Sequence, residues 1–256
     1  NFLTSHQFAI HCSYHSGTEF ISFPWSYRED PTPDHAIHDF LASLYASSSG
    51  YDDIPYGQGF TGMYAINGST KDFGYGALGS ISWSVEISVS KQPPASQVGA
   101  YYLKNKPAML SMVEYAGYGI SGTVTDSVTG EPIPATIFIN DLWQFSNDPE
   151  GGDFHKFLLP GNYEVKVVSN GYETRVISGI SVSSMSLTEL NIALPPAGSS
   201  HFASRIIACQ VPNNNYNDEG FTPAAIGQPD QIRYSLGRMG YAILDMGDTI
   251  HDSEGN

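Results

Sequence analysis

Three segments in the first part of the chain have the alternating or continuous apolar pattern of β-strands. Residues 8–15 (FAIHCSYH) alternate between two faces, and His15 lies on the face that carries the polar side chains. Residues 19–25 (EFISFPW) are extended until a proline ends the strand. Residues 80–88 (SISWSVEIS) are an apolar run with Glu86 as the one acid. The pattern predicts three strands, the third of them buried.

Two segments of the same region repeat apolar residues with the helical period. Residues 34–45 place apolar side chains along one stripe, after a Thr-Pro pair that suits a helix entry. Residues 95–115 are also helical in pattern. Pro107 is expected to lie in the first turn of a second helix, because proline lacks the N–H that a helix interior needs. Together these elements predict a partial α/β fold, a mixed sheet with flanking helices, over residues 1–116.

After residue 116 the pattern changes to short β-type runs separated by turn sequences such as SVTGEP, LPGN and SNGY. Five or more strands at this spacing predict an all-β sandwich over residues 117–195. Residues 152–157 (GDFHKF) are expected to form a loop leading into a strand. After a linker, two more apolar runs predict an incomplete β-rich accessory domain over residues 196–256. The predicted strands are residues 120–126, 135–140, 163–169, 174–182, 187–194, 203–211 and 240–247.

Composition restricts the classes of partner. The 256 residues include 11 Lys+Arg and 26 Asp+Glu, so the formal net charge is −15 and no nucleic-acid or anionic-membrane partner is expected. No run of about 18 apolar residues is present, so no membrane span is predicted. Charged residues make up only 14% of the chain, a balance typical of β-rich proteins outside the cytoplasm. The two cysteines, Cys12 and Cys209, are too far apart to predict a disulfide framework.

Four residues of the first region have the chemistry of a hydrolytic metal site. His15 ends a predicted strand, where a neutral imidazole is a good Zn²⁺ ligand. Glu86 is a carboxylate in an apolar strand, an environment that suits a general base. Tyr64 lies in a Gly-rich loop from which its phenol could cover a substrate, and Asp72 lies between that loop and the strand of Glu86.

Each of these residues also has a purely structural explanation. A histidine on a strand often makes hydrogen bonds in the core. Glu86 could form a salt bridge with Lys71 or Lys91, and Tyr64 could be one of many packed surface tyrosines. Residue types and spacing alone leave both explanations open.

Longer motifs resemble the zinc-dependent metallocarboxypeptidases, the carboxypeptidase A/B and E/N superfamily. HSGTEFISFPWSY (15–27) resembles the segment around the third zinc ligand of the family. YAINGSTKDFGYGALGSISWSVEIS (64–88) resembles the substrate-binding loop and the strand of the general base, with Tyr, Asp and Glu at the family spacing. Residues 117–195 resemble the transthyretin-like module that follows the catalytic domain in regulatory and bacterial members.

The resemblance implies roles for His15 as a ligand of a Zn²⁺ cofactor, Glu86 as the general base and later proton donor, and Tyr64 as a cover over the substrate's C-terminal residue. The family's other zinc ligands lie in an H-x-x-E motif upstream of the third ligand, and no such motif precedes His15. The H-x-x-E at residues 251–254 lies at the wrong end and is expected to be a chance spacing. We expect the missing half of the active site to belong to the same precursor.

The resemblance also indicates which residues would surround the substrate's terminal side chain. Ser26 and Lys71 occupy positions where an acid would favour basic substrates, so no acid is evident to bind a terminal Lys or Arg. Lys71 could attract an acidic side chain as a mobile point charge, or it could point into solvent or pair with a neighbouring acid. Met63, Ile66 and Ser84 would line the same site and leave room for neutral residues.

The function predicted from these observations is that of a zinc-dependent exopeptidase acting on peptide or protein C-termini. The alternative is a non-catalytic surface or filament protein built from a degenerate peptidase domain and β modules. We expect a secreted or cell-surface location, with the β domains contacting other copies or cell-surface components. A serine hydrolase is not expected, because the chain contains no G-x-S-x-G motif.

Overall fold

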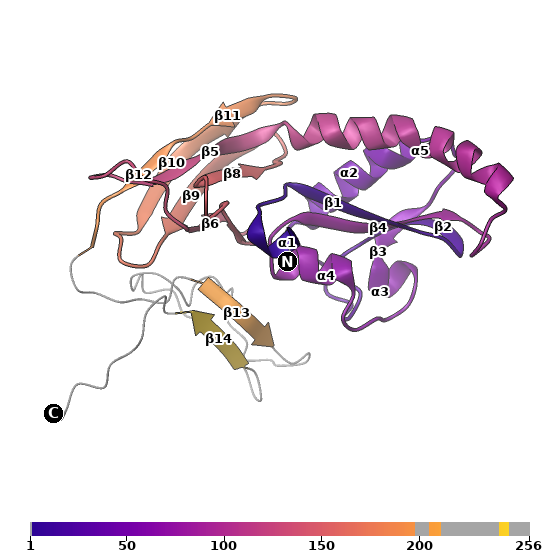
Figure 1. The fold of residues 1–256 in the computed structure, drawn as a ribbon, viewed down its shortest axis with the longest axis horizontal. Helices are drawn as coiled ribbons and strands as arrows, with labels where there is room; N and C mark the ends of the chain where they lie inside the picture. The colour runs from indigo at the N-terminus through magenta and orange to yellow at the C-terminus, as the bar shows by residue number, and fades with distance from the viewer. Residues whose placement is uncertain (1, 198–204, 211–240, 246–256) are drawn as a thin grey trace. The chain divides into compact units, whose positions relative to one another are not determined.

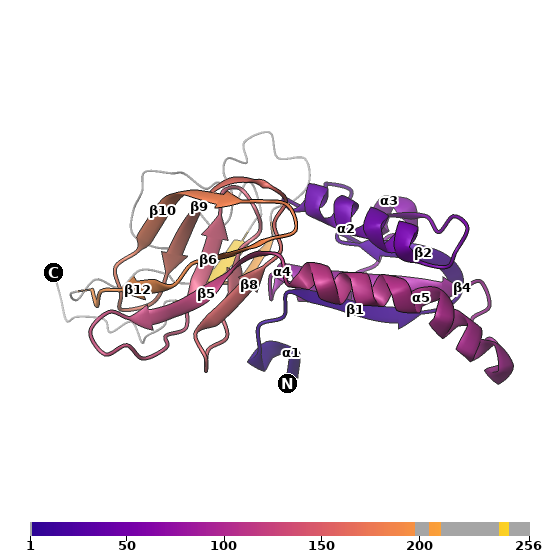
Figure 2. The ribbon, with the colours of Figure 1, turned by 90° about the horizontal axis from the view of Figure 1, so that it is seen from above.

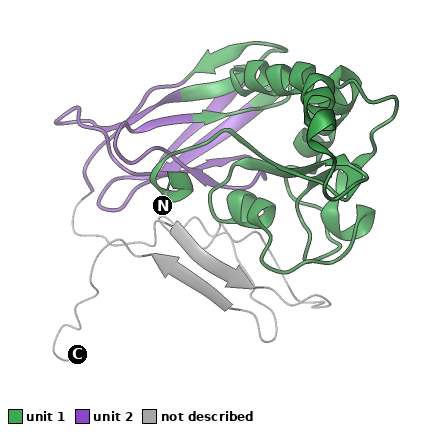
Figure 3. Ribbon diagram, turned by 45° about the vertical axis from the view of Figure 1, so that its right-hand side comes forward, with its two compact units in different colours: residues 1–121, 155–162, 181–189 green, residues 122–154, 163–180, 190–256 purple. Residues whose placement is uncertain are grey.

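The computed structural model describes residues 2–197 and the backbone of residues 205–210 and 241–245 (Figure 1). The chain divides into two compact units (Figure 3). The first contains residues 1–121, 155–162 and 181–189, and the second contains residues 122–154, 163–180 and the chain from residue 190. The first unit therefore includes two short segments from far beyond the predicted α/β region.

A four-stranded mixed sheet with the order β1-β4-β2-β3 lies at the centre of the first unit. Strand β1 (Ile10–His15) pairs in parallel with β4 (Ile81–Ser88). Strand β2 (Thr18–Phe23) pairs antiparallel with β4 and parallel with β3 (Tyr56–Gln58). The three predicted strands are confirmed, and a short fourth strand extends the sheet beyond β2.

Helices cover both faces of this sheet (Figures 1 and 2). Helices α2 (His35–Ser48) and α5 (Ala95–Ala116) lie on one face, and α3 (Gly59–Gly62) and α4 (Thr70–Gly76) lie on the other. A single turn of helix, α1 (Phe2–Ser5), precedes the sheet. The helix predicted over residues 34–45 is confirmed as α2. Among the described residues, no helix combines the length and the apolar character that crossing a membrane requires.

Helix α5 is continuous, so the prediction of a second helix starting at Pro107 is wrong. The proline removes the hydrogen bond to the carbonyl of Leu103, but Leu103 is 66% exposed, so water can replace that bond. Asn105 anchors the helix from its buried side, where its Oδ1 accepts a hydrogen bond of 2.7 Å from the Tyr45 hydroxyl. The buried contacts of α5 therefore lie on the opposite face of the helix from the missing hydrogen bond.

The segment from residue 119 to residue 194 is built of short strands joined by loops, as predicted, but the single strand predicted over residues 187–194 is wrong, because residues 187–189 and 192–194 form two strands. One sheet has the order β10-β9-β6-β7, and another has the order β11-β5-β12 with β8 paired to β5. The transthyretin-like arrangement of these strands stays a prediction. The strands are β5 (Gly119–Asp126), β6 (Thr136–Ile139), β7 (Phe145–Ser146), β8 (Asp153–Lys156), β9 (Gly161–Val168), β10 (Arg175–Val182), β11 (Leu187–Glu189) and β12 (Ile192–Leu194).

The interpretation of residues 152–157 as a loop is wrong, because residues 153–156 form β8. The side chains of Phe154 and Lys156 are almost fully buried, whereas Asp153 is exposed, which is the alternation of a half-buried strand. The sequence did not predict this strand, because a buried lysine interrupts the apolar pattern by which a half-buried strand is identified.

The two strands predicted near the end of the chain are confirmed. Strands β13 (Arg205–Gln210) and β14 (Tyr241–Asp245) pair antiparallel. The H-x-x-E sequence at residues 251–254 lies outside the described residues, and the accessory domain over 196–256 stays a prediction. Cys12 is a free cysteine, and burial raises the pKa of its thiol to about 12.

Candidate active site

Polar side chains of β1 and β4 face one another in pairs along the α4 side of the sheet. Because the two strands are parallel and in register, paired residues project from the same face. Hydrogen bonds join the first two pairs, at 2.8 Å between an imidazole Nδ1 and a serine Oγ and at 3.3 Å between two serine Oγ atoms. The pairs are His11 with Ser82, Ser13 with Ser84 and His15 with Glu86.

The last of these pairs brings together two candidates for catalysis that are 71 positions apart in sequence. His15 and Glu86 are Cα partners, at the carboxyl end of β1 and two residues before the end of β4. The His15 side chain is exposed and Glu86 is half-buried, so the explanation of His15 as a core histidine is wrong. Within the described part of the chain, neither side chain has a hydrogen bond or an ion pair with another protein group. The imidazole and the carboxylate are therefore both available to a ligand.

Helix α4 brings Lys71 and Asp72 to the same face of the sheet. Ser69 caps the helix by accepting a hydrogen bond of 3.1 Å from the Asp72 backbone N–H. Both carboxylate oxygens of Asp72 lie 3.0 Å from the backbone nitrogen of Ser26, which donates to them. Burial raises the pKa of the Asp72 carboxyl, while the Ser26 N–H and the Lys71 charge act in the opposite direction. The Asp72 carboxylate thus connects α4 to the residues that follow β2 through hydrogen bonds.

The Lys71 side chain is only 2% exposed, so the alternative in which it points into solvent is wrong. Burial lowers the pKa of its ammonium group, and attraction to Asp72 and then Glu86 opposes this shift. No ion pair within 4 Å joins Lys71 to a described acid. Lys71 is therefore a buried cation on the side of the sheet that carries Glu86, close enough for the charge of Glu86 to raise the pKa of its ammonium group.

The loop that carries Tyr64 is fixed by backbone hydrogen bonds to the residues after β2. Phe60 N–H donates to the Trp25 carbonyl at 3.0 Å, and Ile66 N–H donates to the Ser26 carbonyl at 2.8 Å. Between these anchors the Tyr64 side chain is 63% exposed. Met63 and Ile66 are half-buried. The loop therefore has fixed ends and presents its phenol to solvent.

Sequence reasoning did not include Ser22 among the site residues. Ser22 is the Cα partner of Ser84 across β2 and β4, so it extends the polar row of Ser13 and Ser84 onto a third strand. Its side chain is fully buried, and its Oγ has no hydrogen-bond partner. The signal for it was a lone polar residue in the apolar run 20–23, which alternation places on the face of the sheet opposite Ile21.

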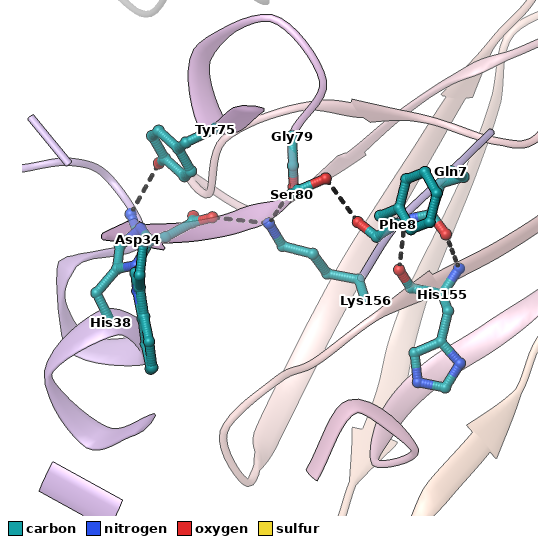
Figure 4. Close-up of polar contacts among 10 residues, drawn as sticks. Gln7, Phe8, Asp34, His38, Tyr75, Gly79, Ser80, His155 and Lys156 are labelled. Carbon is teal, nitrogen blue, oxygen red and sulfur yellow. Dashed lines mark hydrogen bonds and ion pairs between the residues drawn. The ribbon is translucent and has the colours of Figure 1, made fainter. Parts of the chain in front are cut away.

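A buried ion pair between Lys156 and Asp34 lies next to α4 (Figure 4). Lys156 Nζ lies 2.7 Å from Asp34 Oδ2, and the two side chains are 1% and 0% exposed. The same ammonium group donates to the carbonyl of Gly79 at 3.3 Å. The Asp34 backbone N–H donates to the Tyr75 hydroxyl at 3.4 Å, and Tyr75 belongs to α4. The ion pair thereby connects β8 to the helix that carries Lys71.

The donor set for a metal is only partly present among the described residues. Three converging protein ligands are needed for a zinc site, and no group of three His, Cys, Asp or Glu residues in residues 2–197 has that arrangement. His15 fits the role of one such ligand, since its ring is exposed and makes no hydrogen bond to a described residue. Any further ligands would come from residues other than these.

Comparison with known families matches two segments of the chain. Residues 1–108 match the family model described as zinc carboxypeptidase, and residues 119–195 match the model described as carboxypeptidase regulatory-like domain. Carboxypeptidase D of Mus musculus is 27% identical over 219 residues, which cover 77% of this chain and 16% of that protein. Carboxypeptidase SOL1 of Arabidopsis thaliana is 27% identical over 183 residues, which cover 66% of this chain and 37% of that protein.

A third relative is the catalytic chain of carboxypeptidase N from Rattus norvegicus, which is 24% identical over 69% of this chain and 43% of that protein. The chain thus spans less than half the length of each of these relatives. Among solved structures, a cohesin–X-dockerin complex from Acetivibrio cellulolyticus aligns with a TM-score of 0.26 and 25% identity over 29% of this chain and 55% of that chain.

Proposed function

We propose that this chain, which belongs to the zinc carboxypeptidase family through residues 1–108 and carries a carboxypeptidase regulatory-like domain at residues 119–195, is part of an enzyme that removes C-terminal residues from peptides. The observation that carries the proposal is the register of His15 with Glu86 across β1 and β4. Hydrolysis of a peptide bond needs a base that can take a proton from water beside the carbonyl. Glu86 has a free carboxylate at that position.

His15 is proposed as one protein ligand of zinc, with the remaining ligands supplied by residues outside the described part of the chain. When bound, zinc supplies Lewis-acid chemistry to a water molecule and to the scissile carbonyl. The Glu86 carboxylate accepts the proton of the attacking water and later delivers it to the leaving amine. Its half-buried position beside an exposed imidazole lets it reach solvent on one side while the sheet fixes its backbone.

The substrate's C-terminal residue is proposed to lie over α4, between the sheet and the Tyr64 loop. The exposed phenol of Tyr64 covers this residue and donates a hydrogen bond near its carboxylate. Ser26, Met63, Ile66, Lys71 and Ser84 surround its side chain. The anchoring of the loop to Trp25 and Ser26 keeps these groups in place while Tyr64 moves.

The test is Glu86→Gln in the full-length protein loaded with zinc. This change keeps the size of the side chain and removes the base, so hydrolysis of a blocked dipeptide should fall by about 10²- to 10⁴-fold while the zinc content is unchanged. Glu29→Gln, at an exposed glutamate outside the site, is the matched control and should keep full activity. Full activity in Glu86→Gln would contradict the proposal.

Zinc content also discriminates between the enzyme and the non-catalytic alternative. The enzyme should hold one zinc per full-length protein, whereas a binding or structural protein built from a degenerate domain should hold none. We further propose that the protein acts outside the cytoplasm or at the cell surface. This proposal is supported by the low charged fraction of 14% and the net charge of −15.

A further inference from the structure

The dipeptide Asn-Gly occurs at residues 67–68 and again at residues 170–171. An asparagine before glycine can lose its side-chain amide without an enzyme, because glycine has no side chain to keep its backbone nitrogen away from the asparagine side-chain carbonyl. Both glycines have a positive φ, +75° at Gly68 and +77° at Gly171, and a Cβ atom at either would meet no atom within 4 Å. Local sequence and glycine conformation therefore do not distinguish the two sites.

The peptide unit between Asn67 and Gly68 is not held by hydrogen bonds. Both residues are exposed and lie between α3 and α4, in the stretch that also carries Tyr64 (Figure 1). Within residues 2–197, no group forms a hydrogen bond with the Asn67 side chain, the Asn67 carbonyl or the Gly68 N–H. This peptide unit can therefore rotate without breaking a hydrogen bond.

The peptide unit between Asn170 and Gly171 is held on both sides. The two residues are the centre of a turn that is closed by a hydrogen bond of 3.2 Å from the Tyr172 N–H to the Ser169 carbonyl. The Gly171 carbonyl accepts a second hydrogen bond, of 2.8 Å, from the Ala197 N–H. The Asn170 Oδ1 is excluded from solvent. To bring the Gly171 nitrogen to the Asn170 side chain, the turn has to open and these bonds have to break.

We propose that Asn67 deamidates spontaneously in the folded protein and forms isoaspartate, whereas the fold protects Asn170. The Gly68 nitrogen gives its proton to water and forms a bond to the Asn67 Cγ, while the Cγ–Nδ2 bond breaks and ammonia leaves with a proton taken from water. Water then opens the cyclic imide at one of its two carbonyl carbons. Opening at Cγ gives aspartate, and opening at the main-chain carbonyl carbon gives isoaspartate, in which the main chain runs through Cγ.

Isoaspartate at residue 67 lengthens the main chain between two fixed points. On one side, the Ile66 N–H donates to the Ser26 carbonyl at 2.8 Å. On the other side, the Ser69 Oγ caps α4 by accepting from the Asp72 N–H at 3.1 Å. Only two residues lie between these anchors, so one of the anchors has to shift to accommodate the additional main-chain carbon. The product also places a negative charge where the asparagine was neutral.

The test follows both asparagines in one sample of full-length protein. The protein is incubated in mildly alkaline buffer at physiological temperature and digested with trypsin at intervals. Asn67 is the only asparagine of the tryptic peptide 29–71, and Asn170 is the only asparagine of the peptide 167–175. Mass spectrometry measures the deamidated fraction of each, and a digest of protein that was not incubated corrects for reaction during digestion. Asn67 should react about 10-fold or more faster than Asn170, because two hydrogen bonds hold the second site.

The same protein unfolded in urea is the control for local sequence. Unfolding opens the turn around Asn170, so the two rates should become similar. Similar rates in the folded protein, or a faster reaction at Asn170, would overturn the proposal. So would an Asn67 that reacts in urea but stays intact in the folded protein.

A second measurement, which rests on the proposed peptidase function, tests the effect on the loop. The kcat/KM of incubated protein on a blocked dipeptide should fall in proportion to the isoaspartate fraction at residue 67. Asn67→Gln, which would have to form a larger and less favourable ring, should keep its kcat/KM through the same incubation. Unchanged kcat/KM in protein that is mostly isoaspartate at residue 67 would overturn the effect on the loop. If the protein cleaves no peptide before incubation, the peptidase function fails and the peptide map alone decides whether Asn67 deamidates.

Discussion

Lys156→Met is the substitution whose cost the structure defines most sharply. The change removes one partner of the ion pair with Asp34, whose side chain is fully buried. Methionine fills a similar volume, so lost packing contributes little. The Asp34 carboxylate then lacks its cation, and the Gly79 carbonyl loses the donor that lies 3.3 Å away.

The expected loss of stability is about 3–5 kcal/mol, because breaking a buried pair leaves an uncompensated charge. For a unit of this size, 1 kcal/mol corresponds to about 2–4 °C in Tm, so Tm should fall by about 6–20 °C. Replacing both partners, as in Asp34→Asn with Lys156→Met, should cost less than Lys156→Met alone, since two neutral groups replace one stranded charge.

The assay is thermal and urea unfolding of the full-length protein, followed by circular dichroism. Lys106→Met, at an exposed lysine of α5, is the control and should change stability by less than about 0.5 kcal/mol. A loss below about 1 kcal/mol in Lys156→Met would refute the reasoning. So would a double variant that is less stable than Lys156→Met.

Two further predictions concern buried polar side chains in each unit. His38 is fully buried, its Nδ1 accepts a hydrogen bond of 3.0 Å from Trp83 Nε1, and burial first, then the charge of Lys156, holds its pKa well below the usual value. The unfolded chain therefore takes up a proton that the folded chain does not. Stability should fall by about 1.4 kcal/mol per pH unit below about pH 6.5 relative to His38→Gln, as urea unfolding at pH 7, 6 and 5 can measure, and equal slopes would contradict this. In the second unit, Asn147 Oδ1 accepts a hydrogen bond of 2.7 Å from the Ala135 N–H, and its Nδ2 donates to two carbonyls at 2.8 and 3.0 Å. Asn147→Ala should therefore lower the free energy of unfolding, measured by chemical denaturation, by about 2–4 kcal/mol. An unchanged free energy of unfolding would show that water replaces these bonds.

Local pattern was a reliable guide where one face of an element is apolar and the other is not. The sequence predicts both the helix over residues 34–45 and the strand over residues 80–88. The spacing of apolar residues along each segment is enough to identify an apolar helix face or a buried strand. The pattern failed at Pro107, where the missing hydrogen bond is tolerated because Leu103, the residue that carries the affected carbonyl, is exposed. It also failed at β8, whose buried face carries a lysine.

For the candidate site, the sequence by itself determined the residue types and their order. His15, Tyr64, Asp72 and Glu86 stand at spacings that resemble one family of peptidases, and that much follows from the linear chain. The pairing of His15 with Glu86 follows from the register of two strands that are not adjacent in sequence.

The burial of Lys71 and the ion pair between Lys156 and Asp34 were decided only by the tertiary structure. The physical reason is that the environment of a polar group depends on which distant segments exclude water from it. Asp34 and Lys156 are 122 residues apart, and nothing in their local sequence shows that their opposite charges compensate one another when both side chains leave solvent.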